Sequence, residues 1–331
     1  MEKDKTAFKI LSIDGGGIKG LYSATILEHL EKKHGQISDY FDMICGTSTG
    51  GLIALALAQK IPISTICKMY QDKGGVIFPT QSKIAGILKQ IMWKGKYSDK
   101  PLKDVLTSLF GDAKIGDSSN LLCIPSYNFT NAIPRVFKFD HNHLPGRDNN
   151  LSCVDVALAT SAAPTYFPLC EIESLDNRQF IDGGVWANNP TMVGVIEALT
   201  YFVGKDRDFD SIEVLSVSSL NNASGKPLNL KRERSFLQWR NDLFETSLIG
   251  QSYFTNYMME KLCELNNINI KYIRIPSETI SAEQQHLVQL DCATPHAIRF
   301  IRGKGNDRGF LVQNDQNIAK FFKSRKHFNI N

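Results

Sequence analysis

The sequence predicts an α/β fold of three layers, α/β/α, in which helices cover both faces of a mostly parallel central sheet. In the first half of the chain, short runs rich in strand-forming residues alternate with helical runs, an order typical of βαβ units. The composition is that of a globular protein, because 42% of the 331 residues are hydrophobic and 22% are charged. Such a chain can bury a sizeable core without disulfides or a metal.

The expected strands and helices follow one another at short intervals. Strands at 8–13 and 41–45 alternate with helices at 21–33 and 50–58. Further along the chain, the sequence predicts strands at 121–127, 135–139, 179–181 and 212–217, and helices at 152–161 and 191–202. A final helical region is expected at 235–265, and the basic tail at 320–327 is expected to be a solvated helix face.

These elements are expected to form one domain with two regions. Residues 8–220 carry the alternating pattern and would form the core, while residues 221–331 would form a mostly helical extension packed on the same domain. The stretch at 221–229 is polar and contains glycine and proline, which indicates a surface loop between the two.

Composition excludes several classes of protein. The net charge of +4 comes without the dense basic runs of a protein that binds nucleic-acid polymers. Seven cysteines without a C-x-x-C pair argue against a zinc site or a disulfide framework, and fit a reducing cytoplasm. The apolar run at 8–13 is too short for a signal peptide, and no apolar stretch reaches the roughly 18 residues of a membrane span. We therefore expect a cytoplasmic protein that can still associate peripherally with a membrane.

The strongest local motif is Gly46-Thr47-Ser48-Thr49-Gly50, a G-x-S-x-G between a predicted strand and a predicted helix. A strand that turns sharply into a helix strains the backbone of the central serine, and glycines on both sides avoid a clash. The Ser48 hydroxyl would project above the sheet, beside the positive N-terminal end of the next helix. Alone, the motif also fits an ordinary glycine-rich turn. Its position between strand and helix favours a nucleophile.

A second motif, Asp14-Gly15-Gly16-Gly17-Ile18-Lys19-Gly20, also joins a strand end to a helix start. Three glycines let backbone N–H groups converge on an anion without interference from β-carbons. The loop would therefore make an oxyanion hole or a phosphate cradle, with Lys19 as a cation at its mouth.

The loop partly matches one nucleotide-binding motif and fails to match another. The spacing of Gly15, Gly17 and Gly20 fits the dinucleotide fingerprint, which requires an acidic residue at the end of the next strand. Here the next strand leads into Ser48 instead. A P-loop does not fit, because Leu21 stands where its lysine would be.

A third motif, Asp182-Gly183-Gly184, follows the predicted strand at 179–181. Its glycines allow a tight turn that can aim the carboxylate at a neighbouring strand end, although aspartate before glycine is also a common turn former. In a Ser-Asp-His order, the histidine candidates are His286 and His296. Both lie in a polar C-terminal stretch without a clear strand or loop context.

Together the three motifs resemble the hallmarks of the patatin-like phospholipase family, D-G-G-G-x-[RK]-G, G-x-S-x-G and D-G-[GA], in that order. Residues 159–168 (ATSAAPTYFP) resemble the segment that precedes the family's aspartate, and residues 182–190 (DGGVWANNP) continue its motif. The resemblance covers residues 8–220, which it identifies as a patatin-like catalytic core.

The resemblance implies a Ser-Asp dyad without histidine, in which Asp182 takes the proton of Ser48. It also implies a phospholipase A type hydrolysis of fatty-acyl esters in membrane glycerolipids, with no metal and no cofactor. By the same resemblance, the oxyanion hole would be formed by Gly15, Gly16, Gly17 and Lys19. Some bacterial members of this compact type resemble effectors of antiviral signalling, so a cyclic dinucleotide activator is a further expectation.

The segment at 82–96 offers a route to lipid. Its apolar residues follow helical spacing and its lysines supply cations, which fits a lid, a membrane dock or an ordinary core-facing helix. The apolar positions are Ile84, Ile87, Leu88, Ile91, Met92 and Trp93. Tyr166, Phe167 and Trp186 are candidates for an acyl-chain groove, and each fits the protein core equally well.

Two alternatives to the dyad stay open at this stage. One is an esterase or thioesterase with a Ser-His-Asp triad, and the other is a non-catalytic lipid- or nucleotide-binding module that uses the glycine loop. The sequence also leaves the oligomeric state open.

Overall fold

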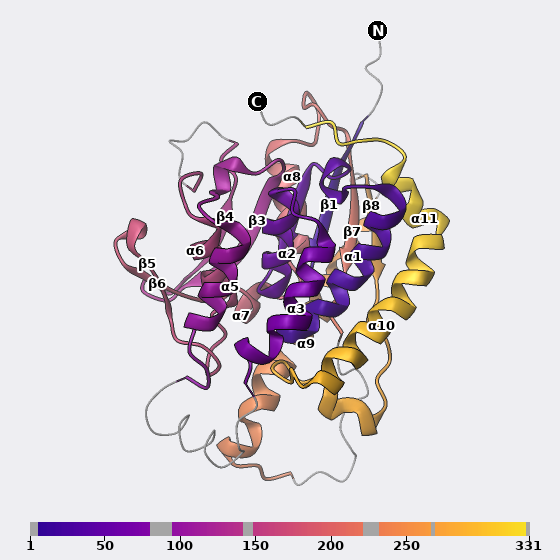
Figure 1. The fold of residues 1–331 in the computed structure, drawn as a ribbon. Helices are drawn as coiled ribbons and strands as arrows, with labels where there is room; N and C mark the ends of the chain where they lie inside the picture. Colours follow the sequence, from indigo (N-terminus) through magenta and orange to yellow (C-terminus); the bar gives the residue numbers. More distant parts are fainter. Residues whose placement is uncertain (1–5, 80–94, 142–147, 221–231, 266–268, 329–331) are drawn as a thin grey trace.

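The structure is a computed structural model that describes residues 6–79, 95–141, 148–220, 232–265 and 269–328 (Figure 1). The residues expected to form a lid or dock, 84–93, lie outside these ranges. The described strands are β1 (Ala7–Ile13), β2 (Met43–Gly46), β3 (Leu121–Asn128), β4 (Ile133–Lys138), β5 (Cys170–Ile172), β6 (Arg178–Asp182), β7 (Ser211–Val217) and β8 (Ile270–Ile275).

Helices occupy most of the remaining described chain. They are α1 (Gly20–His34), α2 (Thr49–Ala58), α3 (Ile63–Ile77), α5 (Lys100–Phe110), α6 (Cys153–Ser161), α7 (Gly184–Ala187), α8 (Thr191–Tyr201), α9 (Phe236–Cys263), α10 (Pro295–Asn314) and α11 (Gln316–Ala319). Every strand and helix predicted up to residue 265 is present, with ends within two residues of the prediction. The sequence did not reveal β5, β8, α3, α5, α7, α10 or α11.

The strands form one sheet in the order β5-β6-β3-β2-β1-β7-β8, and β4 pairs with β3 beside this path. Strands β3, β2, β1, β7 and β8 run parallel to one another. Strands β4 and β6 each pair antiparallel with β3, and β5 pairs antiparallel with β6. The predicted mostly parallel sheet is therefore confirmed. Because parallel strands share one edge for their carboxyl ends, the segments that follow β1 and β2 emerge side by side.

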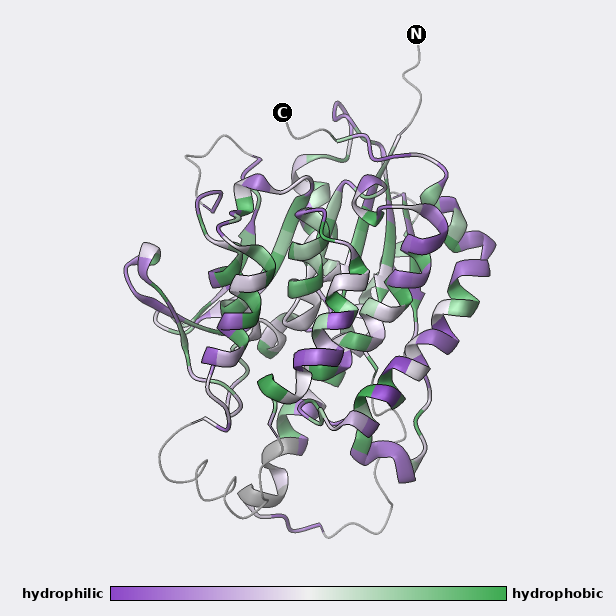
Figure 2. Cartoon of the chain, in the orientation of Figure 1, coloured by the Kyte–Doolittle hydropathy of each residue, from purple (hydrophilic) through white to green (hydrophobic). Residues whose placement is uncertain are grey.

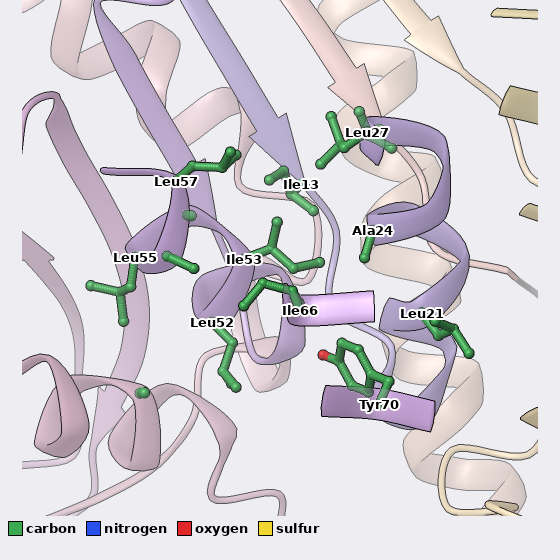
Figure 3. Packing of buried hydrophobic residues seen from close by; sticks show 14 of the residues in the cluster. Ile13, Leu21, Ala24, Leu27, Leu52, Ile53, Leu55, Leu57, Ile66 and Tyr70 are labelled. Carbon is green, nitrogen blue, oxygen red and sulfur yellow. The ribbon is translucent and has the colours of Figure 1, made fainter. Parts of the chain in front are cut away.

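Buried side chains fill both faces of the sheet, so the α/β/α layering is also confirmed. Along β1, Leu11 and Ile13 belong to the core under α1, α2 and α3, whereas Phe8 and Ile10 belong to the core under α8 and α9. Figure 3 shows Ile13 with side chains of α1, α2 and α3 in the first core. In Figure 2 the central strands are largely hydrophobic, while much of α10 is hydrophilic.

Residues after 220 are part of the same sheet and its helical layers. Strand β8 pairs in parallel with β7, α9 packs against β8 and α7, and α10 packs along α1. No helix among the described residues is both long enough and apolar enough to cross a membrane.

The basic C-terminal tail differs from its prediction as a solvated helix face. Only Lys320–Phe322 is helical, as a short 3-10 turn, and Phe321 and Phe322 are buried. The Nζ of Lys9 donates to the Phe321 carbonyl at 3.3 Å, and the Nζ of Lys326 donates to the Ser119 carbonyl. Two adjacent aromatic residues thus hold the tail against the body of the protein.

Candidate active site

Ser48 lies at the turn between β2 and α2, as the motif predicts. Its backbone has φ of 55° and ψ of −125°, a conformation that non-glycine residues rarely adopt. A β-carbon at Gly46 would lie 2.1 Å from the Gly50 carbonyl oxygen, and one at Gly50 would lie 2.3 Å from the Ile13 carbonyl oxygen. The flanking glycines are therefore required by close backbone packing. The strained turn aims the serine side chain out of the sheet.

The carboxylate of Asp182 lies directly beside this serine. Asp182 is the last residue of β6, which pairs with β3, and Ser48 Oγ donates a hydrogen bond to Asp182 Oδ2 at 2.7 Å. The other carboxylate oxygen accepts from the Gly184 amide at 2.7 Å. Both oxygens are thus held, and Oδ2 is the one presented to Ser48.

Burial changes the acidity of this carboxylate. Asp182 is 3% exposed, and burial raises its pKa to about 6, although the hydrogen bonds from Gly184 and Ser48 oppose part of the rise. A carboxylate with this pKa is ionised at neutral pH and is a stronger base than an ordinary aspartate. It is therefore suited to accept a proton from a hydroxyl group.

Thr160 of α6 holds the backbone of the serine turn. Its Oγ1 accepts from the Ser48 amide at 3.0 Å and donates to the Pro125 carbonyl at 2.6 Å. One threonine therefore joins the turn to β3, the strand that also pairs with the end of β6.

The glycine loop reaches the same site from β1. Gly16 and Gly17 line a cavity with Ser48 and Asp182, and their amides donate to no acceptor among the described residues. Gly17 has φ of +59°, and a β-carbon there would lie 2.2 Å from the Leu290 carbonyl oxygen. Glycine is therefore needed at this position, and the two amides are available for an oxyanion.

The expectations for Gly15 and Lys19 require correction. The Gly15 amide already donates to the Asn188 carbonyl at 2.9 Å, so it holds the loop in place. Lys19 is 4% exposed and lies in a small pocket with Glu245, outside the wall of the main cavity. Burial lowers the pKa of Lys19, and the negative charge of Glu245 opposes this effect. Lys19 therefore does not form part of the wall of the cavity at Ser48.

The cavity at Ser48 is mainly apolar and has an empty volume of about 650 Å³, mouth included. Its apolar wall comes from α2, α3, α5, α9 and the segment after α6, and includes Leu52, Met69, Tyr70, Ile77, Phe78, Leu102, Tyr166, Phe167, Phe244 and Leu248. Tyr166 and Phe167 thus lie where the sequence suggested. Trp186 is not part of this wall. Its Nε1 donates to the Ser126 carbonyl at 2.8 Å.

Comparison with known proteins agrees with this arrangement. A family model described as "Patatin-like phospholipase" matches residues 11–195, which include all three motifs. The chain belongs to the patatin-like phospholipase family. It is accordingly a lipid acyl hydrolase.

Individual relatives in this family match most of the chain. A "cGAMP-activated phospholipase" of Pseudomonas aeruginosa is 31% identical across 90% of this chain and 87% of that protein. A protein with the same name in Escherichia coli is 30% identical across 97% of this chain and 94% of its own length. "Patatin-like protein 2" of Oryza sativa subsp. indica is 36% identical across 60% of this chain and 55% of that protein.

In this patatin-like site, no histidine of the described residues lies beside Ser48. None of the described histidines lines the cavity, and both candidates, His286 and His296, are exposed. His286 lies against the Glu283 carbonyl, at 2.7 Å from its Nδ1. The geometry therefore offers Asp182, and no described imidazole, as the partner of Ser48.

Several residues of this patatin-like site were not identified from the sequence as part of it. Phe244 and Leu248 of α9 complete the cavity wall from a region beyond the recognised motifs. Asn188 also lines the cavity, and the Asp14 carboxylate is paired with Arg274 of β8. Asn188 lies in the DGGVWANNP motif at 182–190, which is the sequence signal that points to it. Nothing in the sequence pattern marked Phe244, Leu248 or Arg274 as part of the site.

Proposed function

We propose that this enzyme cleaves fatty-acyl esters of membrane glycerolipids by a Ser48–Asp182 dyad. The observation that carries the proposal is the 2.7 Å hydrogen bond from Ser48 Oγ to Asp182 Oδ2 inside an apolar cavity. Asp182 removes the hydroxyl proton while Ser48 attacks the ester carbonyl, and the same proton then passes to the departing glyceryl oxygen. Such general-base assistance contributes a factor of roughly 10² to 10⁴ in rate.

The Gly16 and Gly17 amides stabilise the oxyanion that forms in this step. Both line the cavity beside Ser48, and both lack an acceptor among the described residues. Ser48 also precedes the first residue of α2, so the positive end of that helix dipole adds to the stabilisation. Loss of one such donor typically costs about 10² to 10³ in rate.

The apolar wall selects a long acyl chain. Aliphatic and aromatic side chains from α2, α3, α5 and α9 surround the space next to Ser48, which favours a hydrocarbon tail over a polar substituent. Fatty-acyl esters therefore fit the site better than short or charged acyl groups do.

The test is product analysis by mass spectrometry on mixed bacterial lipids. We expect Ser48→Ala and Asp182→Asn each to lose at least about 10³-fold of the fatty-acid release. His286→Ala and His296→Ala serve as controls and should keep wild-type rates. Loss of activity in either histidine variant, or persistence of it in Ser48→Ala, would contradict the dyad.

We also propose that a cyclic dinucleotide activates the enzyme, which would act from the cytoplasm in antiviral defence. The support is that relatives matching 90% and 97% of this chain are named cGAMP-activated phospholipases. Purified enzyme should release fatty acid faster from vesicles when cyclic dinucleotide is added, and linear dinucleotide is the control. Equal rates in all three conditions would remove this part of the proposal.

Membrane contact is proposed for the segment that contains Ile87 and Ile91. Support comes from its described flanks: Phe78 lines the cavity, and the Lys96 amide donates to the Thr165 carbonyl at 3.0 Å. Ile87→Asp with Ile91→Asp should abolish binding to phospholipid vesicles while the circular dichroism spectrum stays that of a folded protein. An unfolded double variant would assign these residues to the core.

A further inference from the structure

The side chain of Asn188 is a buried amide that the dyad mechanism does not use. Asn188 is 3% exposed and lines the catalytic cavity together with Ser48 and Asp182. Its backbone amide donates to Gln251 Oε1 at 3.2 Å, and its carbonyl accepts from the Gly15 amide. The side-chain oxygen, Oδ1, is buried and has no hydrogen-bond donor within the part of the chain that the structure describes.

Neighbouring hydrogen bonds fix the direction of this amide. The Ser252 hydroxyl has a single proton, which it donates to Asp14 Oδ2 at 3.3 Å. Ser252 Oγ must therefore accept from the Asn188 Nδ2 group, 3.0 Å away. Because Arg274 keeps Asp14 in an ion pair, the carboxylate acts as the acceptor at the end of this chain. Oδ1 consequently points away from Ser252.

Asn188 Oδ1 lies in the same part of the cavity as Ser48 and Asp182. The position of a β-carbon on Gly15 would be 2.5 Å from Oδ1 and 3.2 Å from Ser48 Cβ. The corresponding position on Gly184 would be 3.3 Å from Oδ1 and 3.0 Å from Asp182 Oδ1. Gly15 therefore leaves open the space between Oδ1 and Ser48, and Gly184 leaves open the space between Oδ1 and Asp182.

We propose that Asn188 Oδ1 orients the water molecule that hydrolyses the acyl-enzyme, an inference that rests on the proposed dyad. A carbonyl oxygen repels an oxyanion and attracts an O–H group. During acylation, the single proton of Ser48 is already donated to Asp182. The nucleophile of the second half-reaction is water, which carries two protons and therefore needs two acceptors. Asp182 accepts the proton that leaves the water, and Asn188 accepts a hydrogen bond from the proton that stays.

The water oxygen forms a bond to the acyl carbon of the Ser48 ester, and one water proton passes to Asp182 Oδ2. The second proton remains hydrogen-bonded to Asn188 Oδ1 and ends on the hydroxyl of the released fatty acid. The bond between the acyl carbon and Ser48 Oγ breaks, and Oγ takes the proton back from Asp182. Enzyme and dyad return to their starting state.

The test compares Asn188→Ala with Asn189→Ala, a matched control. Asn189 is the neighbouring buried asparagine, and it does not line the cavity. Its Oδ1 accepts from the Thr191 amide at 3.1 Å. Each variant is mixed with the p-nitrophenyl ester of a long-chain fatty acid. The rate of p-nitrophenol release in the first turnover gives acylation, and intact-protein mass spectrometry follows the acyl group on Ser48.

We expect Asn188→Ala to slow deacylation by about 100-fold, with acylation changed by less than about threefold, so that acylated protein accumulates. In Asn189→Ala the ratio of the two rates should equal that of the wild type, even if the protein is less stable. Asn188→Leu, which keeps the volume of the amide, replaces the alanine variant if that one unfolds.

The outcomes separate this inference from the dyad. If Asn188 is merely structural, acylation and deacylation slow together and no acyl-enzyme accumulates, which overturns the inference and leaves the dyad intact. An unchanged rate ratio overturns it as well. If Ser48→Ala still forms product, the dyad fails first, and the role of Asn188 fails with it.

Discussion

Arg274 binds both carboxylate oxygens of Asp14, at 3.2 Å from Nη1 to Oδ1 and 2.6 Å from Nη2 to Oδ2. Asp14 is the residue immediately before the glycine loop, and Arg274 lies on β8, beyond the region matched by the family model. The Asp14 side chain is 0% exposed and that of Arg274 is 15% exposed. The C-terminal part of the chain therefore neutralises a buried charge at the base of the glycine loop.

Replacement of this arginine by methionine should be strongly destabilising. Arg274→Met leaves the Asp14 carboxylate buried without its cation, and such a loss costs about 3–5 kcal/mol of unfolding free energy. Urea denaturation would measure it. Lys271→Met, on the same strand, is the control: its pair with Glu213 is partly exposed, so we expect less than about 1 kcal/mol. Equal losses in the two variants would contradict the importance of the buried pair.

A chain that ends at residue 220 should not fold. We interpret residues 8–220 as the catalytic core and residues 221–331 as an extension of the same domain. Removing the extension deletes β8 and α10, exposes the edge of β7 and leaves Asp14 unpaired. Near-ultraviolet circular dichroism and limited proteolysis would report the loss of packing. A protease-resistant, cooperatively unfolding fragment would show instead that the core is independent.

The pH dependence of hydrolysis should follow Asp182. Burial raises the pKa of this carboxylate to about 6, and only the ionised form can accept the Ser48 proton. We therefore expect kcat/KM on a neutral ester to rise about tenfold per pH unit below pH 6 and to level off above it. A stopped-flow profile from pH 4.5 to 8 would measure this. A midpoint near pH 4 would mean that Asp182 behaves as an exposed aspartate.

The raised pKa of the Asp182 carboxylate also predicts that Asp182→Asn stabilises the fold. Because the pKa is raised on folding from its ordinary 3.8 to about 6, the ionised carboxylate destabilises the folded state above pH 6. This penalty fades as pH falls through 6 and is gone below 3.8. Asparagine avoids it, so we expect a gain of about 1–3 kcal/mol at pH 8 that shrinks toward pH 4. Urea titrations at both pH values would detect the difference.

The sequence revealed those parts of the site that short-range geometry imposes. Gly46 is needed by the turn itself, because a β-carbon there would meet the Gly50 carbonyl oxygen, so this part of the motif is readable without the fold. Gly50 is needed for a different reason, since a β-carbon there would meet the Ile13 carbonyl oxygen of β1. The meeting of the glycine loop with Ser48 follows from β1 and β2 being parallel neighbours. Whether Asp182 reaches Ser48 depends on the pairing of β6 with β3 in the antiparallel part of the sheet. That pairing was not predictable from the chain, and only the resemblance suggested the contact.

Other elements were hidden because tertiary contacts decide them. Helix α10 contains three glycines, which disfavour a helix in isolation. In the fold, Gly305 and Gly309 let α10 approach α1, since β-carbons there would lie 2.6 Å from Thr25 and 2.5 Å from His29. The free oxygen of Asn188 is likewise fixed by Ser252, which is 64 residues away in the sequence. Such long-range partners leave no local pattern.

The serine turn offers a sharp test of backbone packing with a glycine control. Gly46→Ala would place a methyl group 2.1 Å from the Gly50 carbonyl oxygen, so either the turn opens or α2 shifts. We expect a loss of more than about 3 kcal/mol in stability, or at least about 100-fold in activity if the turn adapts. A β-carbon at Gly303, in α10, meets no described atom beyond its own helical backbone within 4 Å, so Gly303→Ala should stabilise the protein by up to about 1 kcal/mol. Denaturation curves and rates of ester hydrolysis would be measured for both variants. A Gly46→Ala enzyme with wild-type stability and rate would mean that Ser48 does not need its strained backbone.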